Sequence, residues 1–481
     1  MGCGGTKSKY DEAAAKGDGL AGTLAALDTG DDDDVGRSRT KSAEVISPEK
    51  EEKLNIVKEV YIFRHLSGHQ LNLVVDALQL RKYSNGDKII TQGQGGDSFF
   101  VVANGELQVL IDGKKIRDLG KNAYFGERAL LFNEKRTATV QVTSKKVDAW
   151  SVDKATFLQI VKGNMQTQLM HRIRMQDTSV TLEDLETVRR IGEGAAGSVD
   201  LVEHKKTKTR YALKKVQKEN GALPQEVVRE MDLLKMNDHP FVMQLVKTFE
   251  SEDLAYMLVE LITGGELHAA IRTIPTVLSA SQAQFYVGSL ALALEALHIR
   301  RIIYRDLKPE NVMLDYQGYL KIIDFGIAKK LDGEKNRTYT MVGTPHYMAP
   351  EVMKGRAYGY VVDHWALGII LFELVIGYLP FANDADETQE VFKEVLQNRI
   401  EFPKWYKDQG GMKLMQGLIC HDAKTRLGNK GIDDFRSAGW FMAASRASGT
   451  HLFDQLMGRE LDAPVVPKGE VFAVDQPDEE E

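Results

Sequence analysis

Cysteine is scarce in this chain, which holds only Cys3 and Cys420 among its 481 residues. Two cysteines so far apart exclude a disulfide-stapled secreted domain and favour a reducing, intracellular compartment. Long apolar runs are also missing. WALGIILFELVIG, which begins at Trp365, is interrupted by Glu373 and falls short of the roughly 18 residues that a membrane-spanning helix needs, so we expect a buried core helix there. The N-terminus likewise lacks the apolar core of a secretory signal.

An excess of positive charge is absent too. The chain has 62 Lys and Arg against 69 Asp and Glu, a net charge of −7 and a pI near 6.0, so nothing predicts a nucleic-acid partner. Hydrophobic residues make up 43% and charged residues 27%, an ordinary balance for a globular protein with buried cores. The length predicts two or three domains of about 150 residues each.

The first 50 residues are rich in Gly, Ala, Asp and Ser and include an acidic run at 31–34. Such a segment buries too little apolar surface to offset chain entropy, so we expect a disordered tail. It starts MGCGGT, where Gly2 and Thr6 fit the N-myristoylation pattern and Cys3 offers a palmitoylation site. Two acyl chains anchor stably and one only marginally, which predicts attachment to the cytoplasmic face of a membrane. A free tail is the alternative.

Residues 53–175 predict a first folded domain. KLNIVKEVYIF has helical spacing, and short strand-like runs follow it. Asn104-Gly105 joins SFFVVA to ELQVLI and Asp112-Gly113 joins ELQVLI to KKI, and such pairs are strong hairpin signals. TATVQV and DAWSV then continue the meander, so the strands predict a small barrel or jelly roll. Helical periodicity returns over residues 154–175.

The second unit starts after VTLEDLETVRRI with IGEGAAGSV. Glycines at such a turn let the backbone approach phosphates, although this spacing alone is weak and fits an ordinary hairpin equally well. Lys214 follows in YALKK on an expected strand, and Glu230 lies on the next helical segment, where it can pair with that lysine. The residues of the glycine-rich pattern are Gly192, Gly194, Gly197 and Val199.

Further along come YRDLKPEN and IIDFG, and then APE at 349–351. Asp306, Asn311 and Asp324 in these motifs carry hard oxygen ligands suited to Mg²⁺, and a carboxylate can also accept a proton from a hydroxyl. In this order and at this spacing the motifs of residues 182–467 resemble the protein-kinase family. We therefore expect a two-lobed kinase domain at 182–440, a C-terminal tail at 441–481 and an α+β fold overall.

The resemblance implies ATP and Mg²⁺ as cofactors and gives each motif residue a role. Lys214 would hold the α- and β-phosphates, clamped by Glu230. Asp306 would orient the substrate hydroxyl and take its proton, and Lys308 would neutralise the γ-phosphate. The resemblance also places Asn311 and Asp324 on the metal ions, and Glu260 and Ile262 with the glycine-rich residues at the ATP site. A catalytically silent kinase would normally lack one of these residues, and none is missing.

Finer features resemble the cyclic-nucleotide-dependent kinases of the AGC group. Tyr304 stands where most kinases have His, and RTYTMVGTPHYMAPE resembles their activation segment, with Thr340 as phosphate acceptor and Arg305 ready to pair with it. DLKPEN and Thr344 indicate Ser/Thr specificity. The tail fits less well, because VFAVDQPDEEE lacks the usual aromatic-acidic motif, which puts its contribution to ATP binding in doubt.

The same resemblance predicts protein substrates with basic residues before the phosphoacceptor. Glu266, Glu310 and Glu373 match the family carboxylates that receive those arginines. RSRTKSAEV at 37–45 is similar to the autoinhibitory segments of the group, and Ser42 in it is either a pseudosubstrate residue or an autophosphorylation site. A solvated basic stretch is the alternative for this segment.

FGERALLFNEKRTATV resembles the phosphate-binding cassette of cyclic-nucleotide-binding domains. A cyclic phosphate needs a fixed cation and N–H donors, and Arg136 would supply a planar guanidinium while the segment after Gly126 presents backbone amides. Glu127 would accept from the ribose 2′-hydroxyl. The alternative is a surface ion pair of Arg136 with Glu127 or Glu134, which does not explain the apolar frame.

Thr137 bears on which nucleotide binds. In the family a Thr after the arginine is typical of cGMP sites, where its hydroxyl meets the guanine amino group, whereas Ala is typical of cAMP sites. We therefore expect a cGMP-activated Ser/Thr kinase, and a monomer, since no dimerising heptad repeat is evident. A cAMP-activated or promiscuous kinase and a catalytically silent sensor are the alternatives.

Overall fold

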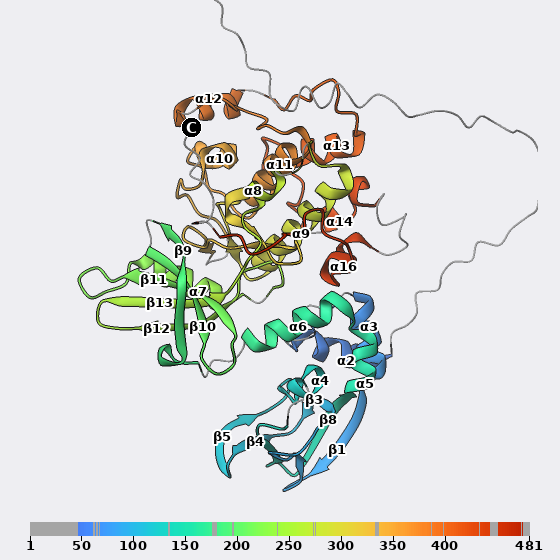
Figure 1. Cartoon of the computed structure of the whole chain (residues 1–481). Helices are drawn as coiled ribbons and strands as arrows, with labels where there is room; N and C mark the ends of the chain where they lie inside the picture. Colours follow the sequence, from blue (N-terminus) through green and yellow to red (C-terminus); the bar gives the residue numbers. More distant parts are fainter. Residues whose placement is uncertain are drawn as a thin grey trace, which may run out of the picture.

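The computed structural model describes residues 47–60, 63, 66, 68–132, 135–175, 180–194, 197–237, 239–272, 274, 276–331, 336–385, 387–397, 399–431, 433–442, 451–472 and 474. Gly2, Cys3, Ser42 and the whole segment 37–45 lie outside these residues. Figure 1 shows a sheet-rich N-terminal unit with flanking helices, followed by another sheet and a larger helical lobe. The predicted α+β fold is confirmed.

The first unit is a jelly roll of two four-stranded sheets, in the orders β1-β8-β3-β6 and β2-β7-β4-β5. Its strands are β1 (Gln79–Ser84), β2 (Lys88–Ile90), β3 (Ser98–Asn104), β4 (Leu107–Ile111), β5 (Lys114–Leu119), β6 (Tyr124–Phe125), β7 (Thr139–Val142) and β8 (Lys146–Asp153). Its helices are α2 (Pro48–Glu59), α3 (Gly68–Ala77), α4 (Glu127–Leu131), α5 (Lys154–Ile160) and α6 (Gly163–Met175).

The hairpin predicted at Asn104-Gly105 is wrong. Strand β3 pairs with β8 and β6, whereas β4 pairs with β5 and β7, so the chain crosses between sheets at Gly105. Strand β3 is buried on both faces, since Phe99 packs toward the helices and Phe100 toward the other sheet. Within its sheet β3 lies between β8 and β6, and a turn sequence alone does not determine the partners of a strand.

Of the other two strand predictions, one is confirmed and one is wrong. The Asp112-Gly113 hairpin is confirmed, because Ile111 pairs with Lys114 and both turn residues have positive φ, 50° and 77°. The runs TATVQV and DAWSV do not continue a meander, since β7 and β8 belong to different sheets. Of the two predicted alternatives, a small barrel and a jelly roll, the structure supports the jelly roll.

The second unit opens with a five-stranded antiparallel sheet in the order β12-β13-β11-β10-β9, packed against α7. The helical lobe follows the sheet in the chain, and its core surrounds α9 and α11. The elements of the sheet lobe are β9 (Leu185–Gly194), β10 (Gly197–His204), β11 (Arg210–Gln217), α7 (Gln225–Lys235), β12 (Leu245–Glu250) and β13 (Leu254–Glu260). Those of the helical lobe are α8 (Leu267–Arg272), α9 (Ala280–Ile299), β14 (Ile302–Ile303), β15 (Val312–Leu314), β16 (Leu320–Ile322), β17 (Lys329–Lys330), α10 (Pro350–Met353), α11 (Val361–Ile376), α12 (Thr388–Gln397), α13 (Gln409–Leu418), α14 (Asp433–Arg436) and α16 (Leu452–Met457).

Helix α11 is the apolar run that the sequence predicts as a core helix. It is buried on almost every side, with Trp365 fully enclosed, and it ends at Gly377, which adopts a left-handed conformation with φ of 94°. A helix that is apolar all round belongs in a core, and glycine closes it because a left-handed cap strains other residues. Within the part of the chain that the structure describes, no helix is both long and apolar enough to span a bilayer.

Candidate functional site

Arg136 lies in a small pocket of the jelly roll, at the start of α4. Its Nη2 donates to the carbonyl oxygen of Ser98 at 2.8 Å and its Nη1 to that of Gly126 at 3.5 Å. The pocket, of about 100 Å³, is lined by all four residues predicted for the cyclic nucleotide: Gly126, Glu127, Arg136 and Thr137. Burial lowers the pKa of the guanidinium, although Asp97 and Glu127 oppose the shift. The structure thus brings a half-buried cation and a helix start to one place.

Two glycines make room for this arginine. A Cβ on Gly126, which has a φ of 82°, would lie 2.6 Å from Arg136 Nη1, and a Cβ on Gly96 would overlap the same guanidinium. Any larger residue at either position would have to displace the side chain. The predicted site does not include Gly96. The signal that could have found it is the glycine-rich run GQGGD directly before β3.

The cleft between the two lobes of the second unit holds a cavity of about 280 Å³. Lys214 on β11 lies 2.9 Å from both carboxylate oxygens of Glu230 on α7, which is the predicted pair. Burial raises the pKa of Glu230, with the Lys214 charge opposing that shift. Of the residues predicted for ATP and metal, the cavity is lined by Gly192, Val199, Lys214, Glu230, Glu260, Ile262 and Asp324.

Gly194 and Gly197 are not among the described residues that line this cavity, but they lie on the same two strands as Gly192 and Val199, which do line it. They are paired across the β9–β10 hairpin, and Gly197 has a φ of 132°. A Cβ on Gly197 would overlap the carbonyl oxygen of Lys215, so this position requires glycine. Glu260 differs from the others, because its carboxylate bonds to Lys321 Nζ at 2.9 Å behind the cleft. Only the backbone of Glu260 is therefore placed to meet a nucleotide.

The predicted catalytic residues meet at the outer edge of the cleft. Asp306 accepts through Oδ1 from the Thr344 hydroxyl at 2.8 Å and through Oδ2 from Asn311 Nδ2, also at 2.8 Å. Lys308 Nζ lies 3.0 Å from Thr344 Oγ1 and 3.5 Å from Asp306 Oδ2. A carboxylate, an ammonium and a hydroxyl are thus held in mutual contact by residues far apart in the sequence.

The oxygen atoms of Asn311 and Asp324 fit a hard divalent cation. Asn311 uses its amide nitrogen on Asp306, so its carbonyl oxygen remains as a ligand. Asp324 accepts from the Gly326 backbone N–H through Oδ1 alone, at 2.8 Å, and its second oxygen remains for a metal. Carboxylate and amide oxygens are the ligands that Mg²⁺ prefers.

Thr340, the predicted phosphate acceptor, is exposed on the activation segment. Its carbonyl oxygen accepts from the Tyr358 hydroxyl, and Arg305 Nη1 donates to that same hydroxyl at 3.3 Å. Arg305 is thus linked to Thr340 through Tyr358. Beneath this segment the buried Asp363 accepts from the backbone N–H groups of Tyr304 and Arg305 at 3.0 and 2.8 Å, which fixes the strand that leads to Asp306.

The three carboxylates predicted to receive substrate arginines lie at two separate places. Glu373 accepts from the Tyr347 hydroxyl at 2.8 Å, and Glu310 is close enough to act on its charge. Burial raises the pKa of Glu373 to about 7, Glu310 adds to the rise, and the Tyr347 hydrogen bond opposes it. Glu266 instead lines the ATP cavity.

The C-terminal tail contributes a wall of the ATP cavity that the sequence leaves in doubt. Phe472 is 2% exposed, lines the cavity and packs with the apolar residues of the sheet lobe. Arg189 lies over its ring at 4.9 Å, and Glu470 forms two hydrogen bonds with Arg210, at 2.6 and 2.7 Å. The signal in the sequence is the aromatic residue in VFAVD, which precedes an acid by three positions instead of directly.

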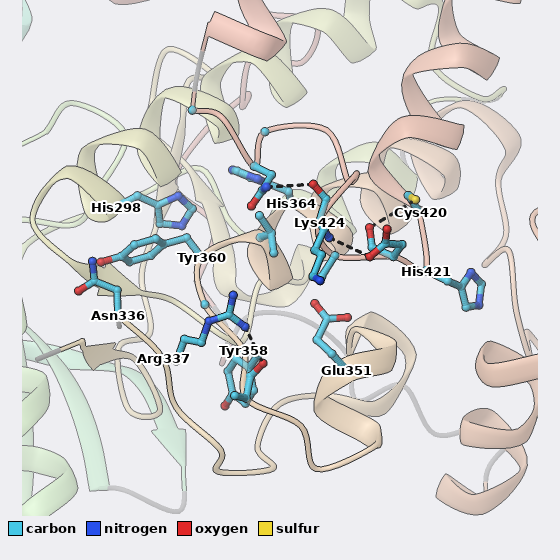
Figure 2. A pocket seen from close by; sticks show the side chains of 18 of the residues that line it. His298, Asn336, Arg337, Glu351, Tyr358, Tyr360, His364, Cys420, His421 and Lys424 are labelled. Carbon is cyan, nitrogen blue, oxygen red and sulfur yellow. Dashed lines mark hydrogen bonds between the residues drawn. The ribbon is translucent and has the colours of Figure 1, made fainter. Parts of the chain in front are cut away.

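A larger cavity, of about 1180 Å³, lies in the helical lobe around the start of α11. Figure 2 shows His364 and Lys424 above it, with Arg337 and Glu351 directed toward its centre. Its lining carries charges of both signs, and Glu351 is already paired with Arg426 at 2.6 Å. None of the described residues predicted for catalysis or nucleotide binding lines it, so size alone does not identify the reaction site.

The comparisons with known proteins agree with this geometry. Residues 185–441, more than half of the chain, match the model of the protein kinase domain, and residues 80–164 match that of the cyclic nucleotide-binding domain. Over 428 residues, 88% of this chain, it is 47% identical to the cGMP-dependent protein kinase of Eimeria tenella and 46% identical to that of Toxoplasma gondii, and it covers 42% of each.

A third relative has the same name and a similar identity. The cGMP-dependent protein kinase of Plasmodium berghei is 46% identical over 428 residues, which are 88% of this chain and 49% of that protein. The chain thus spans about half the length, or slightly less, of these curated relatives. With more than half of its own length matched to the kinase model, the chain belongs to the protein kinase family, and it carries a cyclic nucleotide-binding domain ahead of its kinase domain.

Proposed function

We propose that this protein is a cGMP-activated Ser/Thr protein kinase that transfers the γ-phosphate of ATP to substrates with basic residues before the phosphoacceptor. The observation that carries the proposal is the contact of Asp306 with Thr344 and Lys308, at one end of a cleft whose other end holds the Lys214–Glu230 pair. The names of the relatives support cGMP as the effector.

In this proposal each side chain of the cleft positions a group or screens a charge. Lys214, held by Glu230, binds the α- and β-phosphates, while Gly192 and Val199 cover the nucleotide. Mg²⁺ on Asn311 and Asp324 neutralises phosphate charge when bound. Asp306 orients the substrate hydroxyl and accepts its proton, and Lys308 stabilises the transferred group. Thr344, which contacts both, favours Ser and Thr acceptors.

In the first domain, Arg136 takes the cyclic phosphate and exchanges its bonds to Ser98 and Gly126 for charged ones. Glu127 accepts from the ribose and Thr137 contacts the guanine. A cAMP-activated or promiscuous enzyme remains the second candidate, since Thr137 contributes one hydrogen bond only. A silent sensor is disfavoured by the formed Lys214–Glu230 pair.

Regulation and organisation follow from the same proposal. Cyclic nucleotide would release the segment 37–45 from a substrate cleft bounded by Glu310 and Glu373, and phosphorylation of Thr340 would support the active form. The domains would run over 53–175 and 182–440, followed by the tail at 441–481, in a monomer.

Membrane attachment is a separate part of the proposal, supported by the start MGCGGT. Myristate on Gly2 and palmitate on Cys3 would together hold the chain at the cytoplasmic face of a membrane. Gly2→Ala should move the protein to the soluble fraction. Equal partitioning of the variant and the wild type would remove this part and leave the kinase proposal intact.

The kinase proposal is tested by phosphorylation of an arginine-rich Ser/Thr peptide, with cGMP and cAMP titrated separately. We expect half-maximal activation at a lower concentration of cGMP than of cAMP. Activity that neither nucleotide changes would contradict the regulatory part, and no activity at saturating cGMP would contradict the enzymatic part.

A further inference from the structure

Helix α6 leaves the first domain and extends toward the kinase sheet (Figure 1). There it contacts the start of the segment 260–262, termed the hinge, which leads from the end of β13 toward the helical lobe. His171 Nε2 on this helix lies 3.5 Å from Oε2 of Glu260. The next residue, Arg172, is 1% exposed and donates through Nη1 to the carbonyl oxygen of His239 at 3.1 Å. Met175, at the end of the helix, packs in one cluster with Val202 of the kinase sheet. The helix that ends the nucleotide-binding domain is therefore also part of the kinase core.

Glu260 is the residue through which this contact can reach the ATP cavity. It ends β13, and Leu261 and Ile262, which follow it directly, both line that cavity. Its carboxylate is 1% exposed and accepts from Gln244 N at 2.7 Å and from Lys321 Nζ at 2.9 Å. The side chain thus anchors the hinge from behind.

A carboxylate buried this completely is stable only if charges and donors around it compensate for lost water. Burial alone would raise the pKa of Glu260, but Lys321 and His171 outweigh burial and hold it well below its usual value. Part of that compensation comes from α6, and therefore from a different domain. A change in the position of α6 alters the surroundings of the hinge anchor.

We propose that His171 is a positioning residue for the ATP site, which couples the nucleotide-binding domain to the hinge through Glu260. The inference rests on the proposed function and adds a specific link to it. A ligand of the first domain can shift the kinase only through contacts that differ between two states, and the His171–Glu260 contact behind the ATP cavity is assigned this role. By linkage, ATP and the cyclic nucleotide then influence each other's binding equally.

The variant His171→Ala tests this link in the full-length protein. The side chain of His171 is 31% exposed, so its removal leaves no large buried cavity. The measurements are the Kd of a non-hydrolysable ATP analogue with and without saturating cGMP, and the Kd of cGMP with and without that analogue. A third measurement, kcat at saturating ATP with and without cGMP, shows whether the chemical step is affected. Thr167→Ala, at an exposed position on the same helix, is the matched control, and His171→Gln restores a donor at the same place.

We expect cGMP to change the Kd of the ATP analogue in the wild type by about threefold, the size of one partly exposed hydrogen bond, and the analogue to change the Kd of cGMP by the same factor. In His171→Ala both ratios should approach one while kcat at saturating ATP is kept. Thr167→Ala and His171→Gln should keep the wild-type ratios. If His171→Ala keeps them too, or if the wild type shows no coupling, the inference is overturned. Loss of cGMP activation in the wild type itself would instead overturn the proposed function.

Discussion

The Tyr347 hydroxyl donates to Glu373 Oε2 at 2.8 Å, beneath the surface where substrates are expected to lie. Glu373 belongs to α11, the core helix, while Tyr347 comes from the activation segment. The activation segment is thus directly joined to Glu373, a carboxylate that we propose binds substrate arginines. Because burial raises the pKa of Glu373 to about 7, this carboxylate titrates in the range where kinases are assayed.

Binding of arginine-bearing substrates should therefore depend on pH. Above pH 7 Glu373 is ionised and can pair with a guanidinium, whereas below pH 7 it is protonated and neutral. KM for a peptide with upstream arginines should rise as pH falls below about 7, by up to about tenfold per unit. Steady-state kinetics from about pH 6 to about pH 8.5 check this.

Two controls isolate the effect. Glu373→Gln should have a high KM for the peptide at every pH, and a peptide with alanine in place of the upstream arginines should show little pH dependence in the wild type. An unchanged slope in Glu373→Gln would mean that another group titrates.

Asp324→Ala should lower phosphoryl transfer by about a thousandfold or more, because a ligand for Mg²⁺ is lost at the cleft. Binding of labelled cGMP, measured without ATP so that no coupling between the sites enters, should be unchanged, since Asp324 does not line the pocket of the first domain. Asp232→Ala, at an exposed position on α7, is the control and should keep full activity. Near-normal turnover of Asp324→Ala would show that the metal site is assigned wrongly.

Thr137→Ala should weaken activation by cGMP about tenfold, or ~1.4 kcal/mol, and leave cAMP little changed. The reason is that in the proposed site Thr137 would contact only the base, whereas Arg136 would bind the cyclic phosphate that both nucleotides share. Arg136→Ala should accordingly abolish activation by either one. Thr137→Ser keeps the hydroxyl and should retain the preference for cGMP; equal losses for both nucleotides in Thr137→Ala would contradict the role in selectivity.

Phe472→Ala should raise KM for ATP by about fivefold, because a buried aromatic side chain leaves the wall of the cavity. The KM for the peptide substrate should change little. Val474→Ala serves as the control, since Val474 is 48% exposed. If both variants bind ATP like the wild type, the tail packs on the sheet lobe without assisting the nucleotide.

The local part of the architecture can be predicted from the sequence. Lys214 and Glu230 pair as expected from their order on a strand and the next helix, and the apolar run of α11 identifies it as a core helix. The partners of a strand are not local, which is why Asn104-Gly105 suggests a hairpin where the chain changes sheets. A turn sequence specifies backbone angles and carries no information about the sheet on either side.

Contacts between distant segments escape prediction for the same reason. Nothing in MHRIRM indicates that His171 contacts Glu260, which lies much further along the chain. The role of Gly96 likewise becomes clear only from the structure, where the Arg136 guanidinium packs against it. Phe472 is hard to recognise because its neighbours depart from the expected motif. In each case packing in three dimensions, and not periodicity, determines the role of the residue.

The placement of Phe472 also has a pharmacological consequence. The wall that this ring forms lies outside residues 185–441, the stretch that matches the kinase family. A compound that fills this end of the cleft touches both the shared framework and a side chain from the tail. Inhibitors that contact this ring would discriminate among kinases by the sequence of the tail that follows the catalytic domain. A fragment that ends at residue 441 lacks the ring and would be a misleading target for screening such inhibitors.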